Sequence, residues 1–373
     1  MEFRTPGFNP YSLSYSPFYG THLAVASSAN FGLVGNGRLY ILTLTPQGTI
    51  ESPLHYDTRD SLFDVSWSES HSNQLLVASG DGSIKLFDIG IPPPSPTNPS
   101  DGGFPIASFH EHKREVFATH WNLVSKTSFC SSSWDGTIKI WDPNRNSSLL
   151  TLPTHSCTYS TAWSPHSASV LSSVSSDSHL RVFDLRTPPS ASNHLVMNIA
   201  IHAPLRGNAG GAAFPPSEAL THDWNKYRGM TVATGGVDRL IRVFDLRKAG
   251  DQPGRVPGGP GGRAGDQGPV SILAGHEYAV RRLAWSPHQA GMLLSGGYDM
   301  TCRVWTEGEA QTVPGISLGG QRSHGGQEVG RMDQHTEFVT GVDWCLFGGD
   351  GWVASCGWDE RVLVWDVKEL IGR

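Results

Sequence analysis

The chain has 373 residues, with 28 Lys and Arg against 34 Asp and Glu, so its formal net charge is −6. This mild acidity argues against a nucleic-acid-binding protein, which needs basic surfaces to neutralise phosphates. The five cysteines contain no Cys-x-x-Cys pair, so we expect reduced thiols and neither a disulfide framework nor a zinc site. The N-terminus, MEFRTPGFNP, lacks the pattern of a secretory signal, and no apolar stretch is long enough to span a bilayer. We therefore expect an intracellular protein without a membrane span.

One nine-residue pattern recurs along the chain and predicts the fold class. An Asp opens a tight turn, an alternating apolar strand follows, and an aromatic residue with Asp usually closes the pattern. It occupies residues 80–88, 134–142, 176–184, 237–245, 298–306 and 358–366, and more loosely 35–43, where Asn36 replaces the Asp. Asp135 and Asp177 lie 42 residues apart, an interval typical of propeller repeats, and the longer intervals contain insertions. Seven such units predict a seven-bladed, all-β propeller.

Two further markers run in phase with this pattern. An aromatic residue ends a short apolar stretch before each turn, namely Tyr15, Trp67, Trp121, Trp163, Trp224, Trp285 and Trp344. A His precedes most of these stretches, namely His112, His155, His202, His276 and His335. Together the markers resemble WD repeats over residues 10–366.

The resemblance implies a structural role for the recurring His and Asp residues. In WD repeats the loop His, a Ser or Thr of the second strand, the turn Asp and the third-strand Trp hydrogen-bond to one another. One such set in this chain would be His112, Ser133, Asp135 and Trp141. Because similar sets recur, we expect architecture here, with no catalytic residues, no metal site and no cofactor. A propeller hydrolase is disfavoured since no Gly-x-Ser-x-Gly elbow, phosphate loop or zinc spacing is present.

We expect residues 1–373 to form a single domain whose last blade is closed by an N-terminal strand. Only seven residues follow Asp366, too few for a turn and an outer strand, so residues 3–8 are predicted to supply it. The segments rich in Gly, Pro and Ser are predicted to be flexible loops. Those at 91–105, 187–193, 249–268 and 307–327 fall between third and outer strands, and 205–217 falls on the opposite, top face.

The top face carries the loops that lead into the inner strands and the turns between second and third strands. Its composition predicts a protein-binding surface, because aromatic side chains surrounded by polar ones are typical interface anchors. The expected apolar contacts are Phe117, Trp134, Tyr159, Tyr278, Tyr298, Phe338 and Trp358, with Val237 at an equivalent turn position. The expected charge contacts are Asp60, Asp64, Glu111, Glu115, Glu218, Glu277 and Glu337, with Asp64, Glu115 and Glu218 the first choices. An acidic and aromatic face suits a short amphipathic helix that is basic on one side.

Several strings go beyond the general repeat and resemble one family of WD-repeat proteins. They include LFDVSWSE (62–69), DWNKY (223–227), GHEYAVRR (275–282) and HTEFVTGVDW (335–344). The family is that of the import receptors for the type 2, N-terminal peroxisomal targeting signal. The resemblance implies capture of a nine-residue signal, basic at both ends and apolar between, together with a peroxisomal import co-receptor. It also implies delivery to docking proteins on the peroxisomal membrane by a cytosolic receptor that cycles to the peroxisome. A WD-repeat scaffold or ubiquitin-ligase adaptor stays open as the alternative.

Overall fold

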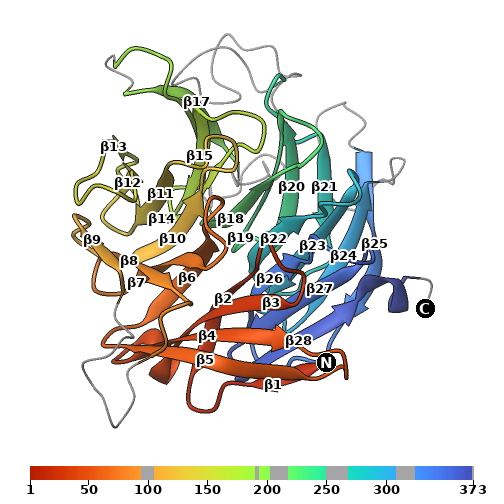
Figure 1. Cartoon of the computed structure of the whole chain (residues 1–373). Helices are drawn as coiled ribbons and strands as arrows, with labels where there is room; N and C mark the ends of the chain where they lie inside the picture. Colours follow the sequence, from red (N-terminus) through yellow and green to blue (C-terminus); the bar gives the residue numbers. More distant parts are fainter. Residues whose placement is uncertain (94–104, 190–192, 202–216, 249–267, 308–323, 372–373) are drawn as a thin grey trace.

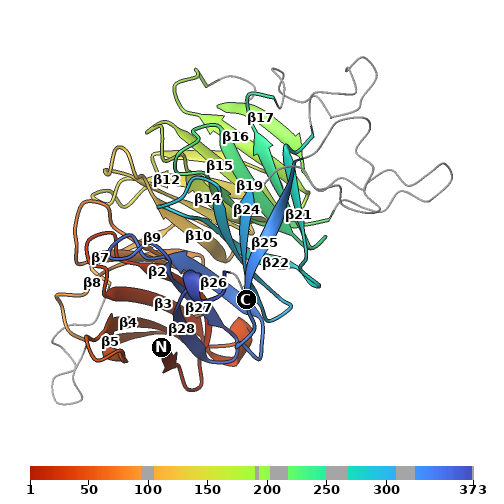
Figure 2. The same cartoon turned by 90° about the vertical axis from the view of Figure 1, so that its right-hand side faces the viewer.

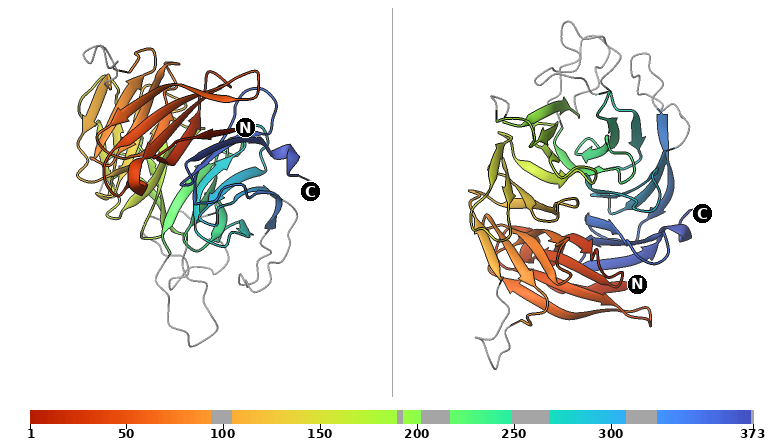
Figure 3. Two further views of the ribbon diagram at one scale, coloured as in Figure 1. Left: turned by 90° about the horizontal axis from the view of Figure 1, so that it is seen from below. Right: turned by 45° about the horizontal axis from the view of Figure 1, so that its top comes forward.

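The computed structural model describes residues 1–93, 105–189, 193–201, 217–248, 268–307 and 324–371. It confirms an all-β, seven-bladed propeller in which each blade is an antiparallel four-stranded unit (Figures 1 and 3). Within these ranges the only helical segments are two short 3-10 turns, η1 (Ala29–Gly32) and η2 (Val367–Glu369). Among the residues described, none of the helical segments is both long and apolar enough to cross a membrane.

The blades are numbered 1 to 7 in chain order, and the strands of each are ordered from the channel outward. The inner strands are β2 (Asn9–Tyr15), β6 (Leu62–Trp67), β10 (Val116–Trp121), β14 (Thr158–Trp163), β18 (Ala219–Trp224), β22 (Val280–Trp285) and β26 (Val339–Trp344). The second strands are β3 (His22–Ser28), β7 (Gln74–Ser79), β11 (Phe129–Ser133), β15 (Val170–Ser175), β19 (Thr231–Gly236), β23 (Met292–Gly297) and β27 (Trp352–Gly357). The third strands are β4 (Gly37–Leu44), β8 (Ser83–Asp88), β12 (Thr137–Trp141), β16 (His179–Asp184), β20 (Leu240–Asp245), β24 (Cys302–Glu307) and β28 (Arg361–Asp366). The outer strands are β5 (Ile50–Thr58), β9 (Ala107–His110), β13 (Leu150–Pro153), β17 (Leu195–Ala200), β21 (Ser271–Ala274), β25 (His324–Met332) and β1 (Glu2–Arg4).

The N-terminal strand closes blade 7, as predicted, although it spans residues 2–4 instead of 3–8. Strand β1 pairs antiparallel with β28, with Phe3 opposite Val362, and Figure 2 shows the N-terminus beside β28. The N-terminal ammonium group donates to the carbonyl of Val364 at 2.7 Å, and Arg361 forms a two-pronged ion pair with Glu2. The edge of the last blade is therefore covered by the start of the chain.

The predicted hydrogen-bonded set forms in blade 3 with one correction. His112 bridges Asp135 at 2.9 Å and Ser131 at 2.8 Å, and Trp141 Nε1 donates to the same Ser131 hydroxyl. Ser131, and not Ser133, is the second-strand member. Ser133 lies at the end of β11, where its hydroxyl donates to the Arg114 carbonyl and accepts from the Asp135 amide instead. Equivalent sets form around His276 in blade 6 and His335 in blade 7.

Blades 2, 4 and 5 hold the turn Asp in another way. A basic residue four positions later on the third strand forms an ion pair with it, in the pairs Asp81–Lys85, Asp177–Arg181 and Asp238–Arg242. Burial pushes the pKa of Asp81 up, but hydrogen bonds from Lys85 and Ser83 outweigh it and hold that pKa at about 2. His155 is exposed and belongs to no such set, while His202 lies outside the described residues. The turn carboxylate is thus the constant feature, and its cationic or imidazole partner varies.

The predicted insertions lie largely outside the described residues. The segments concerned are 94–104, 190–192, 202–216, 249–267 and 308–323. The loop predicted at 307–327 is too long, because β24 includes Glu307 and β25 begins at His324. Strand β25 also pairs in parallel with β21, which joins the outer edges of blades 5 and 6 into one eight-stranded sheet.

Candidate functional site

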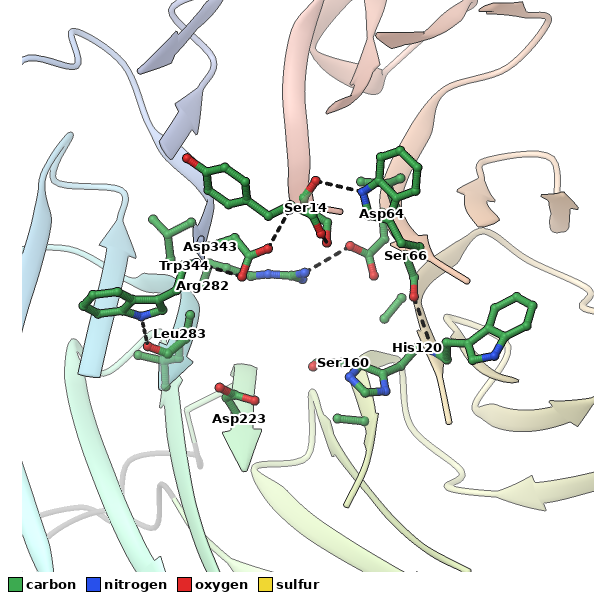
Figure 4. A pocket seen from close by; sticks show the side chains of 18 of the residues that line it. Ser14, Asp64, Ser66, His120, Ser160, Asp223, Arg282, Leu283, Asp343 and Trp344 are labelled. Carbon is green, nitrogen blue, oxygen red and sulfur yellow. Dashed lines mark hydrogen bonds and ion pairs between the residues drawn. The ribbon is translucent and has the colours of Figure 1, made fainter. Parts of the chain in front are cut away.

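The inner strands enclose a central channel whose walls carry charged and polar side chains among apolar ones. It contains a cavity of about 420 Å³, lined by all seven inner strands (Figure 4). Much of its polar lining hydrogen-bonds to the backbone of the next blade. Ser66 accepts from the Trp121 amide, Asp343 accepts from the Tyr15 amide, and Asp223 accepts from the Trp285 amide. These side chains therefore fasten neighbouring blades together.

Asp64 belongs to this channel wall, so its predicted position on the top face is wrong. Its carboxylate accepts from the Ser12 hydroxyl at 2.6 Å, the Thr119 amide at 3.0 Å and Arg282 at 3.2 Å (Figure 4). The residue is only 2% exposed. The β-bulge at Phe63 explains the error, because it turns Phe63 to the top face and leaves Asp64 in the lining of the channel.

Each inner strand carries a β-bulge at the same place near the top face. One extra residue is inserted opposite the second strand, and it lies four positions before the aromatic residue that ends the strand. We call these residues the bulge ring: Tyr11, Phe63, Phe117, Tyr159, Leu220, Arg281 and Thr340. The lining of the channel cavity begins just after them, so the bulge ring surrounds the top mouth of the channel. Bulges commonly re-aim a side chain in this manner next to functional sites.

Aromatic rings from six blades form a continuous band on this face, which we call the aromatic arc. Its members are Tyr298, Phe338, Trp358, Tyr11, Phe63, Phe117, Trp134 and Tyr159. Phe117 stacks between Phe63 and Trp134, with ring centroids 4.6 and 4.5 Å apart. The arc continues through Tyr11, Trp358 and Phe338 to Tyr298, with no centroid step longer than 5.5 Å. The arc thus offers an apolar surface that follows the channel mouth from blade 6 to blade 4.

Six of the seven aromatic residues predicted from the sequence lie in this arc. Tyr278 does not, since it is 63% exposed and makes no ring contact within the described chain. Tyr11 and Phe63 were missed by the sequence prediction. They share the spacing of Phe117 and Tyr159, four residues before the aromatic end of the inner strand, which is the signal that identifies them. Val237 is 47% exposed at its turn, as its position suggested.

The six predicted acidic residues other than Asp64 fall into three groups, of which Glu111 and Asp60 form the first. Glu111 is held by Ser148 and Lys139 within blade 3, so its carboxylate already has partners. Asp60 accepts from the adjacent Ser61 amide at 2.7 Å. Glu115 and Glu218 lie beside the aromatic arc, where Glu115 approaches Arg114 at 3.5 Å and Glu218 accepts from the Tyr159 hydroxyl at 3.1 Å.

Glu277 and Glu337 form the third group. Both are exposed in the loops that enter blades 6 and 7, next to the Tyr298–Phe338 stack. In the described part of the chain neither carboxylate has an ion-pair partner. Their charge is therefore available to a ligand on the top face.

A small apolar loop stands beside the arc. Residues 29–36 connect β3 to β4, and Phe31 of this loop contacts the Trp358 ring at 5.4 Å. Phe31, Leu33 and Val34 are 47%, 84% and 71% exposed. Exposed apolar groups continuous with an aromatic surface are typical of interaction sites.

Comparison with known proteins gives the same architecture and adds a family. The model of the WD domain, G-beta repeat, matches residues 51–88, 103–142, 146–184, 267–306 and 326–366. The peroxisomal targeting signal 2 receptor of Saccharomyces cerevisiae is 38% identical over 98% of this chain and 99% of its own length. Peroxisome biogenesis protein 7 of Arabidopsis thaliana is 39% identical over 97% and 96%, and the human peroxisomal targeting signal 2 receptor is 33% identical over 91% and 87%. The chain therefore belongs to the WD40-repeat family of peroxisomal targeting signal 2 receptors.

Proposed function

We propose that this protein is a non-catalytic cargo receptor that binds type 2 signals of peroxisomal matrix proteins on its top face. The signal lies there as an amphipathic helix whose apolar stripe packs on the aromatic arc. The observation that carries the proposal is the arc itself, because eight rings line the channel mouth where the repeat requires none of them. Aromatic contacts of this kind contribute about 0.5–1.5 kcal/mol each beyond the area they bury.

Carboxylates beside the arc hold the basic ends of the signal. Glu115, Glu218, Glu277 and Glu337 are the candidates, and the burial of Asp64 removes it from this set. A single exposed ion pair contributes only about 0.2–1 kcal/mol, so one carboxylate cannot anchor a helix. Shielding by a second protein would strengthen such contacts, since charge-assisted hydrogen bonds away from water contribute about 1.5–3 kcal/mol.

A peroxisomal import co-receptor is the second protein in this proposal. Ordering a free signal peptide into a helix costs free energy, so the receptor alone is expected to bind weakly. The co-receptor covers the exposed side of the helix, and the apolar loop at Phe31, Leu33 and Val34 is a surface on which it can rest. The loaded complex is then delivered from the cytosol to docking proteins on the peroxisomal membrane, and the receptor returns.

The direct test is fluorescence anisotropy of a labelled type 2 signal peptide titrated with the protein, with and without co-receptor. The control peptide has its two basic end residues replaced by Glu. We expect the first peptide to bind, the control peptide to fail, and the co-receptor to tighten binding. Failure of both peptides to bind a folded sample would contradict the receptor function, and equal affinity with and without co-receptor would contradict the coupling.

A further inference from the structure

Arg281 is the one cation of the bulge ring, and none of the described residues supplies it with a counter-charge. It is 8% exposed at the channel mouth on β22. The neighbouring Arg282 pairs with Asp64, but Arg281 has no hydrogen bond or ion pair with any residue that the structure describes. It shares the bulge ring with the aromatic residues Tyr11 and Tyr159.

The β-bulge of β22 places Arg281 at the channel mouth, and its charge acts on two tyrosines of the aromatic arc. Burial raises the pKa of both Tyr11 and Tyr159, and the charge of Arg281 acts against that rise at each of them. Tyr11 belongs to blade 1 and Tyr159 to blade 4, on either side of the channel from blade 6. The registers of the three inner strands thus place Arg281 at the bulge position that Tyr11 and Tyr159 occupy in their own blades.

The side chain of Arg281 is largely buried, and its five N–H donors have no acceptor among the described residues. Its presence at this position makes sense when a ligand supplies the acceptors. The ligand must be apolar enough to rest on the aromatic arc and must present oxygen atoms of negative character at the mouth. The basic side chains at the two ends of the signal cannot accept hydrogen bonds from Arg281. The C-terminal end of a helix can, because its last four carbonyl groups have no intrahelical partners. These carbonyls also form the negative end of the helix dipole.

We propose that Arg281 hydrogen-bonds the C-terminal carbonyl groups of the bound signal helix and so fixes its direction across the channel mouth. The inference rests on the proposed function and deepens it. The C-terminal end lies over blade 6, where Glu277 and Glu337 are placed to meet the basic residue of that end. The N-terminal end points across the channel towards blade 3, where Glu115 beside Trp134 suits the positive end of the dipole. A nine-residue helix of this kind is about 13.5 Å long.

The test compares Arg281→Met with the wild-type protein and with Arg145→Met, which removes an exposed arginine between the third and outer strands of blade 3. Two labelled signal peptides are used, identical except that one ends at the last helical residue as a carboxylate and the other as a carboxamide. We expect the wild-type protein and Arg145→Met to bind the carboxylate peptide more tightly. Arg281→Met is expected to bind both peptides roughly tenfold more weakly and to lose the preference between them.

Thermal unfolding separates a binding role from a structural one. If Arg281 serves the ligand, its replacement by Met leaves the melting temperature unchanged or raises it, because a buried unpaired charge is removed. A lowered melting temperature, or unchanged affinity and preference, would overturn the proposal. A loss of affinity that appears only in the presence of co-receptor would also overturn it, since Arg281 would then contact the co-receptor. Absence of binding to the wild-type protein would instead point to failure of the proposed function itself.

Discussion

The two ends of the inner strands differ in what their side chains do. Near the lower end, the residue before each terminal aromatic faces the channel, and at Ser66, Asp223 and Asp343 its side chain accepts a hydrogen bond from the next blade. At the upper end the bulge ring presents mainly aromatic rings, which contact one another and the top-face turns. The lower residues are satisfied within the fold, whereas the upper ones form an open apolar surface with Arg281 among them.

This difference separates architecture from function within a single strand. From the sequence, a polar residue of the channel can be mistaken for a ligand-binding group. Asp64 is an example, because its hydrogen-bond partners are residues of other blades. An aromatic residue at the bulge looks like core, yet Tyr11, Phe117 and Tyr159 are only half-buried and contribute to the top face. Position along the inner strand is therefore a better guide to function here than residue type.

The largest expected effect comes from removing the strand that closes blade 7 of the propeller. Deletion of residues 1–9 removes β1, the Glu2–Arg361 ion pair, and the packing of Phe3 and Phe8 against the core of blades 7 and 1. We expect a loss of about 5 kcal/mol in the free energy of unfolding, measured by urea titration, because two phenylalanines and an edge strand are lost. Glu2→Gln is the control and should cost less than about 1 kcal/mol. An unchanged melting temperature of the deletion variant would show that blade closure does not stabilise the propeller.

Asp64→Ala tests whether the channel wall is structural. It removes the acceptor of Ser12 and Thr119 and leaves the charge of Arg282 without its partner. We expect a loss of about 3–5 kcal/mol in unfolding free energy, with unchanged signal-peptide affinity of the folded fraction. Asp60→Ala is the matched control and should stay within about 0.5 kcal/mol. Lost peptide affinity at unchanged stability would return Asp64 to the binding site.

Asp343, in the same channel wall, is expected to make the stability of the protein depend on pH. Burial raises the pKa of its carboxyl to about 6, so in the folded protein it stays protonated where the unfolded chain is already ionised. A raised folded-state pKa contributes stability at low pH that is lost as the pH rises through the folded pKa. The stability of the wild-type protein relative to Asp343→Asn should therefore fall by about 2 kcal/mol between pH 4 and pH 7. A stability difference that is flat over this range would mean that the carboxyl titrates normally.

Phe117→Ala tests the upper end of the strand. Phe117 occupies the centre of the arc between Phe63 and Trp134, and its loss opens a gap in the apolar surface. We expect about tenfold weaker binding of the signal peptide, which corresponds to about 1.4 kcal/mol. Phe347→Ala, at a 43% exposed phenylalanine of a bottom-face loop, is the control and should bind normally. Equal affinities of the two variants would argue against the arc as the docking surface.

Much of the fold could be predicted because the same structural residues recur in successive repeats of the sequence. The turn Asp, the aromatic strand end and the alternating third strand recur with a fixed phase, so seven blades and the N-terminal closure follow from spacing alone. The error of Ser133 for Ser131 arose because both serines share one face of β11, and only the three-dimensional register shows which one meets Trp141.

The site was predicted less completely because the alternation of apolar and polar residues in the sequence does not reveal where a β-bulge occurs. A regular strand would place Asp64 and Phe63 on opposite sides, but the bulge decides which of them reaches the top face. Partners also decide availability: Glu111 is occupied by Lys139 and Ser148, whereas Glu277 and Glu337 are not held in this way. Such pairings join residues far apart in the chain, and local spacing does not encode them.

The central claim is that cargo binds over the bulge ring and not in the channel or on the bottom face. Amide hydrogen exchange, measured by mass spectrometry with and without signal peptide and co-receptor, tests it most directly. We predict protection of the top-face segments 29–36, 114–118, 157–160, 277–281 and 336–340, and no change in the bottom-face loops 68–73, 122–128 and 225–230. Protection confined to the bottom-face loops would contradict the account.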